Sequence, residues 1–146
     1  MPNQILWDGN PSPETLLSTD LNALANDGRI LSGEIDNSSD LKTIIDFELS
    51  LDTQASARST GACVDIYLLS SIDGTNYPGS AAADPTLNQL IGSFAFSAAT
   101  AAERDVIKSI ELPPGLHKIV VKNRTGQAFA ASANTLKYRT YCLEVQ

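Results

Sequence analysis

Residues 41–51, LKTIIDFELSL, alternate apolar and polar side chains, with only Ile44 out of step. A period of two is typical of a β-strand with one buried and one solvated face. Leu41, Ile45, Phe47, Leu49 and Leu51 share one face of the expected strand. The opposite face carries Lys42, Asp46, Glu48 and Ser50.

Similar short runs lie on both sides of this stretch. They cover residues 30–36, 63–69, 90–96, 106–112, 116–122, 127–131 and 136–145, with turn residues between them. The turn Pro113-Pro114-Gly115 separates two of these runs so closely that we expect 106–112 and 116–122 to form a hairpin. About eight strands with little helix predict an all-β protein, an antiparallel β-sandwich of jelly-roll-like form.

Residues 1–28 differ from the rest of the chain. Breaker residues fill 8–13, and the leucines that follow, Leu21 and Leu24 among them, have helical spacing. This segment is therefore predicted to be an N-terminal arm that contains one short helix. The remaining residues, 29–146, are predicted to form the β-sandwich domain.

Charge and hydropathy exclude several classes of partner. The net charge of −7 argues against nucleic acid, whose binding proteins usually present a basic face. No apolar run approaches the roughly 18 residues that a membrane-spanning helix needs, so no membrane association is expected. The N-terminus has no secretory signal, which predicts synthesis in the cytosol. Cys63 and Cys142 have no zinc-binding spacing, and they are either buried thiols or a disulfide.

Few residues offer catalytic chemistry. His117, the single histidine, lies within an expected strand, and no Gly-x-Ser-x-Gly motif is present. Asp46 and Glu48 share a strand face, which suits either an acid/base pair of the glycosidase kind or an ordinary solvated face. Asp73-Gly74-Thr75-Asn76 is expected to be a turn and not a calcium loop. The sequence thus predicts a protein that is not an enzyme, with no cofactor and no metal.

Two segments are candidates for binding another molecule. Ile5, Leu6 and Trp7 form an apolar cluster in the arm, and Trp is frequent in binding hot spots. The same cluster could instead fold back onto the sandwich. The polar stretch 70–88 is long for a hairpin turn, and Asp73, Asn76 and Tyr77 within it are candidate loop contacts. Lys137 and Arg139 on the last strand, together with Lys118 and Lys122 on another, form either a small basic patch that suits an acidic protein surface or scattered edge charges.

Several stretches resemble a family of small proteins from tailed bacteriophages, the capsid decoration (cement) proteins. The resemblance covers residues 64–77, 111–115, 121–126 and 130–138, together with 17–25 and 35–37. It implies a β-sandwich, often a homotrimer, that binds the outer capsid surface and bridges neighbouring copies of the major capsid protein. It also implies a location in the virion after synthesis in the host cytoplasm. No catalytic residue follows from it.

Two other functions remain open at this stage. Jelly-roll folds also occur in lectins, so a carbohydrate-binding virion module is the main alternative, with Tyr67, Tyr77 and Tyr138 stacking on sugar rings. A glycosidase that uses Asp46 and Glu48 is the second.

Overall fold

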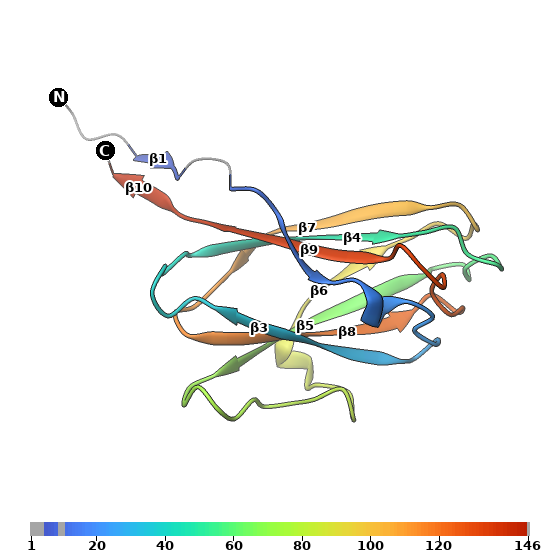
Figure 1. Cartoon of the computed structure of the whole chain (residues 1–146), viewed down its shortest axis with the longest axis horizontal. Coiled ribbons are helices and arrows are strands. Elements are labelled where there is room, and N and C mark those ends of the chain that lie inside the picture. The colour runs from blue at the N-terminus through green and yellow to red at the C-terminus, as the bar shows by residue number, and fades with distance from the viewer. Residues whose placement is uncertain (1–4, 9–10, 146) are drawn as a thin grey trace.

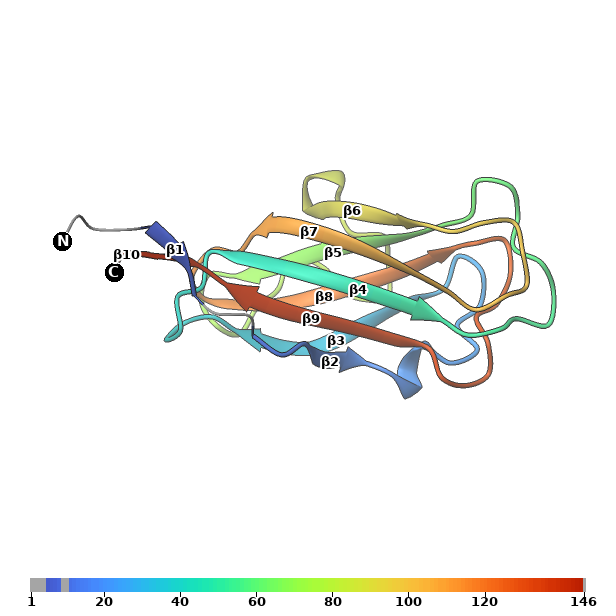
Figure 2. The ribbon, with the colours of Figure 1, turned by 90° about the horizontal axis from the view of Figure 1, so that it is seen from above.

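The structure is a computed structural model that describes residues 5–8 and 11–145. Two antiparallel sheets of four strands pack face to face, so the predicted all-β sandwich is confirmed (Figures 1 and 2). One sheet has the order β2-β9-β4-β7, with β2 Glu14–Leu17, β9 Thr135–Tyr141, β4 Ile44–Leu51 and β7 Glu103–Glu111. The other has the order β3-β8-β5-β6, with β3 Arg29–Asp36, β8 Leu116–Arg124, β5 Cys63–Ser71 and β6 Leu90–Ala95.

The alternation in β4 fixes which side of its sheet faces the core. Ile45, Phe47, Leu49 and Leu51 are all buried between the two sheets. Leu41, which the pattern places on the same face, lies before the strand with a φ of 49° and is 55% exposed. The prediction for Leu41 is therefore wrong, because the left-handed backbone at this residue ends the alternation.

The predicted hairpin of residues 106–112 and 116–122 does not form. β7 pairs with β4, whereas β8 lies between β3 and β5 in the opposite sheet. The turn at 113–115 is thus a corner that carries the chain from one sheet to the other. The buried side chain of Asn37 stabilises this corner by donating to the carbonyl oxygens of Pro113 and Lys42 at 2.9 and 2.8 Å.

Residues 127–131 form no strand, although Phe129 and Ala130 within them are buried. The backbone of this segment bonds instead to the turn near Leu24, since the amide of Phe129 donates to the Leu24 carbonyl at 3.0 Å.

The short helix expected in the N-terminal arm is wrong: the segment holds strand β2 and a single 3-10 turn, η1 Thr19–Leu21. β2 pairs with β9, and this ladder satisfies the backbone better than an isolated short helix could. Leu17 and Leu21 from this segment are buried in the sandwich core. A boundary at residue 28 stays a prediction.

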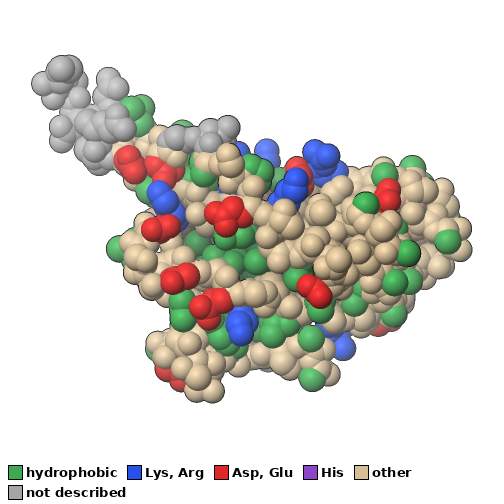
Figure 3. All heavy atoms as spheres, in the orientation of Figure 1, with side chains coloured by type: hydrophobic (Ala, Val, Ile, Leu, Met, Phe, Trp, Pro, Cys, Tyr) green, Lys and Arg blue, Asp and Glu red, His purple; other side chains and the backbone are tan. Residues whose placement is uncertain are grey.

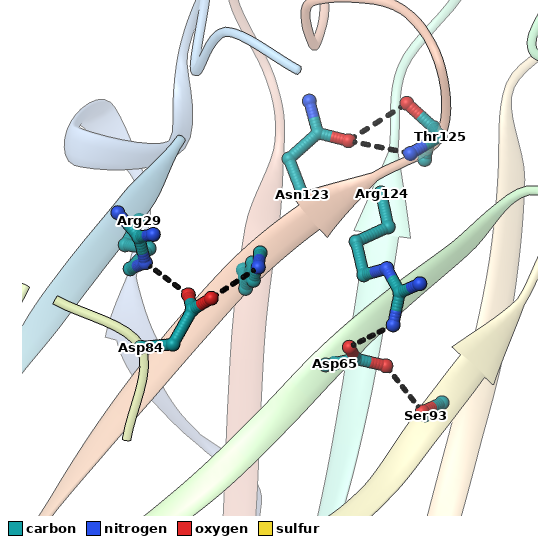
Figure 4. Close-up of polar contacts among 8 residues, drawn as sticks. Arg29, Asp65, Asp84, Ser93, Asn123, Arg124 and Thr125 are labelled. Carbon is teal, nitrogen blue, oxygen red and sulfur yellow. Dashed lines mark hydrogen bonds and ion pairs between the residues drawn. The ribbon is translucent and has the colours of Figure 1, made fainter. Parts of the chain in front are cut away.

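The long loop between β5 and β6, which ends in the 3-10 turn η2 Leu87–Gln89, covers the outer face of its sheet. A small second cluster lies under it, made by Tyr67, Leu69 and Val120 with Leu31 and Tyr77. Asp84 of the loop bridges Arg29 of β3 and Lys122 of β8, the latter at 2.8 Å (Figure 4). These two ion pairs hold the loop against the sheet.

Candidate functional site

A two-stranded antiparallel ribbon projects beyond the sandwich at one end (Figures 1 and 2). It consists of β1 Ile5–Trp7 and β10 Leu143–Val145, with Trp7 opposite Leu143. Its apolar side chains are open to solvent: Ile5 is 69% exposed, Leu6 42%, Trp7 57% and Leu143 52%. The arm cluster thus does not fold back into the core.

Asp8 fastens the base of this ribbon. Its amide donates to the carbonyl of Cys142, and the amide of Cys142 donates to the Asp8 carboxylate, both at 3.0 Å. The ammonium group of Lys42 forms an ion pair with the same carboxylate and, as the main cause, lowers the pKa of Asp8. The ribbon is therefore tied to the loop before β4 by charge as well as by backbone bonds.

Asp8 also lies close to two other residues of the kinds that bind metal ions. Ligand atoms of Asp8, Cys142 and Glu144 all lie within 4.8 Å of one another. The Lys42 ammonium already neutralises Asp8, and the Cys142 thiol donates to it at 3.5 Å. The closeness of these three side chains is therefore accounted for by the ion pair and hydrogen bonds that hold the base of the ribbon. Both cysteines are free thiols and half-buried.

The ribbon also contacts the sandwich through aromatic rings. The ring centroids of Trp7 and Tyr141 are 5.3 Å apart in an edge-to-face arrangement. The Tyr141 hydroxyl donates to the Asp46 carboxylate at 3.0 Å, which fixes this ring on the outer face of the sheet.

Two further exposed apolar side chains lie at the same end of the sandwich. Leu41 is 55% exposed in the loop before β4, and Ile72 is fully exposed directly after β5. The strand registers place these two loops at the same end of the sandwich as the ribbon, because Ile44 pairs with Tyr141, and Ser71 and Asp36 both pair with Leu116. We call this set the apolar end; its members are Ile5, Leu6, Trp7, Leu41, Ile72 and Leu143.

The sequence singled out the first three of these residues and missed the others. The sequence pattern predicts Leu41 in the core, and it predicts Leu143 within one continuous last strand. The break at Cys142, which separates β9 from β10, has no turn residue to mark it. The alternation of Tyr141 and Leu143 was the available signal for a second exposed strand.

The candidate loop contacts Asp73, Asn76 and Tyr77 lie near the apolar end, but their polar groups form hydrogen bonds with other residues of the protein. The Asp73 carboxylate accepts from the amides of Thr75 and Asn76 at 2.9 and 2.7 Å, which lowers its pKa. The Tyr77 hydroxyl donates to Glu34 at 2.6 Å, and Lys118 lies 4.4 Å above the Tyr77 ring. Burial, followed by this bond, raises the pKa of Tyr77 to about 12.

The catalytic candidates are bonded in place. His117 is 1% exposed; Nδ1 lies 2.9 Å from the Ser70 hydroxyl and Nε2 lies 2.8 Å from the Pro113 carbonyl. Asp46 is buried, so the expectation of a solvated strand face is wrong at this position. It lies beside the bulge at Ser109, whose amide donates to it at 2.8 Å, and Arg139 donates to it at 3.0 Å.

The tyrosines considered for sugar stacking lie in different places. Tyr67 is buried beneath the β5–β6 loop, and Tyr77 lies under Lys118. Tyr138 is half-buried, its hydroxyl donates to Glu14 at 2.9 Å, and burial raises its pKa to about 12. Trp7 and Tyr141 are the ring pair that lies at the apolar end.

No helix among residues 5–8 and 11–145 has the length and apolar character required to cross a bilayer. No protein-family model matches the chain, and no curated protein matches it. Among solved structures, the chain is similar to a family 6 carbohydrate-binding module, with 12% identity over 98% of this chain and 94% of that chain. The TM-score of 0.39 makes this a distant likeness.

Proposed function

We propose that this protein is a non-enzymatic docking protein that binds the surface of another protein through its apolar end. The observation that carries the proposal is the exposure of Trp7, together with Ile5 and Leu143, on a projecting ribbon. Large apolar side chains gathered on an exposed surface are typical of interaction sites. A Trp in such a cluster is a frequent source of binding energy.

The form of the ribbon supports the same function. Two strands of three residues are marginally stable in water, and both outer edges of this ribbon lack a neighbouring strand in the described structure. Asp8 and Tyr141 hold the ribbon in one orientation before any partner is bound. A preordered apolar surface loses less conformational entropy on binding than a mobile arm would.

The resemblance to tailed-phage decoration proteins supplies the partner in this proposal. The partner is the major capsid protein on the outer face of the virion, and bound copies, as homotrimers, bridge neighbouring subunits and stabilise the shell. A protein partner agrees with the net charge of −7, which disfavours packaged nucleic acid as a ligand.

Co-sedimentation with purified capsids tests this function. The triple variant Ile5→Ser, Leu6→Ser, Trp7→Ser should lose capsid binding while its circular dichroism spectrum and melting temperature stay close to those of the parent. Leu87→Ser is the matched control, because Leu87 is 82% exposed but lies outside the apolar end. Capsid binding by the triple variant at the parent level would overturn the proposal.

Carbohydrate binding is the second candidate, and one feature of the structure favours it. Trp7 is exposed beside Tyr141, and two rings inclined to each other offer a stacking surface for a sugar ring. A glycan array followed by calorimetric titration distinguishes the two functions. Saturable binding of a glycan that Trp7→Ala abolishes would favour the sugar, whereas capsid binding without any glycan signal would favour the protein surface.

A further inference from the structure

We propose a second binding site, on the outer face of the β2-β9-β4-β7 sheet, that takes carboxylate side chains from an acidic segment of a partner protein. A groove of about 250 Å³ lies on this face. Pro13 and Val106 form its apolar sides, and Lys108, Lys137 and Arg139 supply positive charge to it.

The charges of this face differ from those of the whole chain. The outward positions of its strands carry four cations, Arg104, Lys108, Lys137 and Arg139, and three acids, Asp46, Glu48 and Glu111. The face therefore has a net charge of +1 in a chain whose net charge is −7. Several blue spheres of Lys and Arg lie along the upper edge of the molecule, with a few red spheres among them, and most of the red spheres lie on its left side (Figure 3).

Two cations of this site differ from all other Lys and Arg side chains of the protein in forming no ion pair or ring contact with the described residues. Eight of the ten Lys and Arg side chains lie against an acid or an aromatic ring. The other two, Lys108 and Lys137, make no hydrogen bond, ion pair or ring contact with the described residues. Both line the same groove.

The two acids that line the groove, Asp46 and Glu48, do not neutralise these lysines. Asp46 is 4% exposed, and its carboxylate accepts from the guanidinium group of Arg139 and from the Tyr141 hydroxyl, at 3.0 Å each. Glu48 is paired across the sheet with Lys137, but its carboxylate lies 3.6 Å from Arg104 on the other side. An incoming carboxylate would therefore meet two ammonium groups that have no fixed counter-charge.

The shape of the groove favours an acidic protein segment over a charged sugar. Its sides are the aliphatic groups of Pro13 and Val106, which suit the methylene groups of Glu side chains. Of its two lining rings, Phe47 is 1% exposed and Tyr138 is half-buried with a bonded hydroxyl, so neither presents an open face for a sugar ring.

The face of β9 that lines the groove also leads to the apolar end. Lys137, Arg139 and Tyr141 share one face of β9, and the ring of Trp7 lies against Tyr141. A partner surface that covers the ribbon could thus extend an acidic segment along β9 into the groove. Such charge complementarity mainly raises the association rate and fixes the orientation of the partner.

The site is tested by titrating the purified protein with acetyl-tetraglutamate amide and following backbone amide chemical shifts. We expect shifts confined to β4, β7 and β9, and a loss of affinity as salt rises. The double variant Lys108→Gln, Lys137→Gln should bind at least about tenfold more weakly. The matched control is Lys118→Gln, Arg124→Gln, which removes the same charge from the opposite sheet and should bind like the parent.

If the control variant lost peptide affinity equally, the loss would reflect the overall charge of the protein, and the proposed site would be wrong. No binding by the parent protein would overturn it as well. Binding of tetragalacturonate but not of the peptide would overturn the protein occupant. The result is independent of the apolar end, because the Ile5, Leu6, Trp7 triple variant keeps the groove and should bind the peptide normally.

Discussion

The ring of Trp7 stands edge-on to the ring of Tyr141, with 5.3 Å between the ring centroids and 68° between the ring planes. This contact joins the projecting ribbon to the sandwich, because the Tyr141 hydroxyl is bonded to the buried Asp46. Edge-to-face pairs of this kind contribute roughly 0.5–1.5 kcal/mol beyond the area they bury. The orientation of the projecting ribbon therefore depends on the ring of Tyr141, at the end of β9.

Replacing this ring should loosen the ribbon. Trp7 is the single Trp of the chain, so its fluorescence reports on the ribbon alone. Tyr141→Ala should increase acrylamide quenching of Trp7 and lower its anisotropy, because the indole loses its neighbour. Tyr77→Ala, which alters the opposite sheet, should leave both signals unchanged. Quenching of Tyr141→Ala identical to the parent would show that Asp8 alone holds the ribbon.

Acid should release the ribbon from its base. The pKa of Asp8 is lowered in the folded protein, first by its bond to Lys42, from an ordinary value of 3.8. The stabilisation is therefore fully present above this value and is lost as the pH falls through the lower, folded pKa. Trp7 anisotropy should decrease in that range. Asp8→Asn should give a low anisotropy at every pH, and a parent-like anisotropy in this variant would contradict the role of Asp8.

The buried carboxylate of Asp46 should be important for stability. Asp46→Ala removes the acceptor of Ser109, Arg139 and Tyr141, and we expect the free energy of unfolding to fall by about 3 kcal/mol. Glu48→Ala is the control on the same strand face, with an expected change within about 0.5 kcal/mol. Urea denaturation measures both. Equal losses in the two variants would mean that the network adds nothing beyond strand propensity.

The N-terminal segment should be inseparable from the core in stability measurements. Leu21 is fully buried, and Leu21→Ala should lower the free energy of unfolding by about 3 kcal/mol. Leu87→Ala, at an exposed position, should be neutral. Thermal unfolding of Leu21→Ala at the parent temperature would indicate that this segment docks on the sandwich without contributing to it.

The β5–β6 loop should detach in acid. Its Asp84 has a pKa lowered to about 2 by the side chains of Arg29 and Lys122. The ion pairs are complete above the ordinary value of 3.8 and are lost as the pH approaches 2. Asp84→Asn should mimic acid at neutral pH by accelerating amide exchange across the loop. Asp105→Asn, in β7, should not change exchange in the loop.

The architecture was accessible from the sequence because its signal is local. Alternation in β4 identified the buried face, since a period of two needs no knowledge of the partner strand. The prediction of a hairpin at Pro113 is wrong because this outcome is not decided locally. A Pro-Pro-Gly turn specifies a change of direction, but the choice between a hairpin and a corner depends on β4 and β5, which lie more than 40 residues away.

The candidate site likewise combines features that local sequence predicts with features that depend on distant parts of the chain. The apolar cluster at Ile5 was visible as composition, whereas the pairing of Trp7 with Leu143 joins two ends of the chain and leaves no local trace. The basic groove was even less accessible. The sequence places Lys137 in a possible basic patch. It does not reveal that Arg104 and Arg139 form ion pairs with acids whereas Lys137 does not, and this difference is what distinguishes Lys137.

The position of β9 has a consequence for biosynthesis. β9 is inserted between β2 and β4, so a sheet begun by residue 14 cannot be closed until residues 135–141 have left the ribosome. Until then β4 presents an open edge, and Leu17 has no strand to hold it in the core. Chains in which residues 135–141 have not yet been made are thus exposed to edge-to-edge aggregation along β4, and the sandwich cannot be completed before β9 is available.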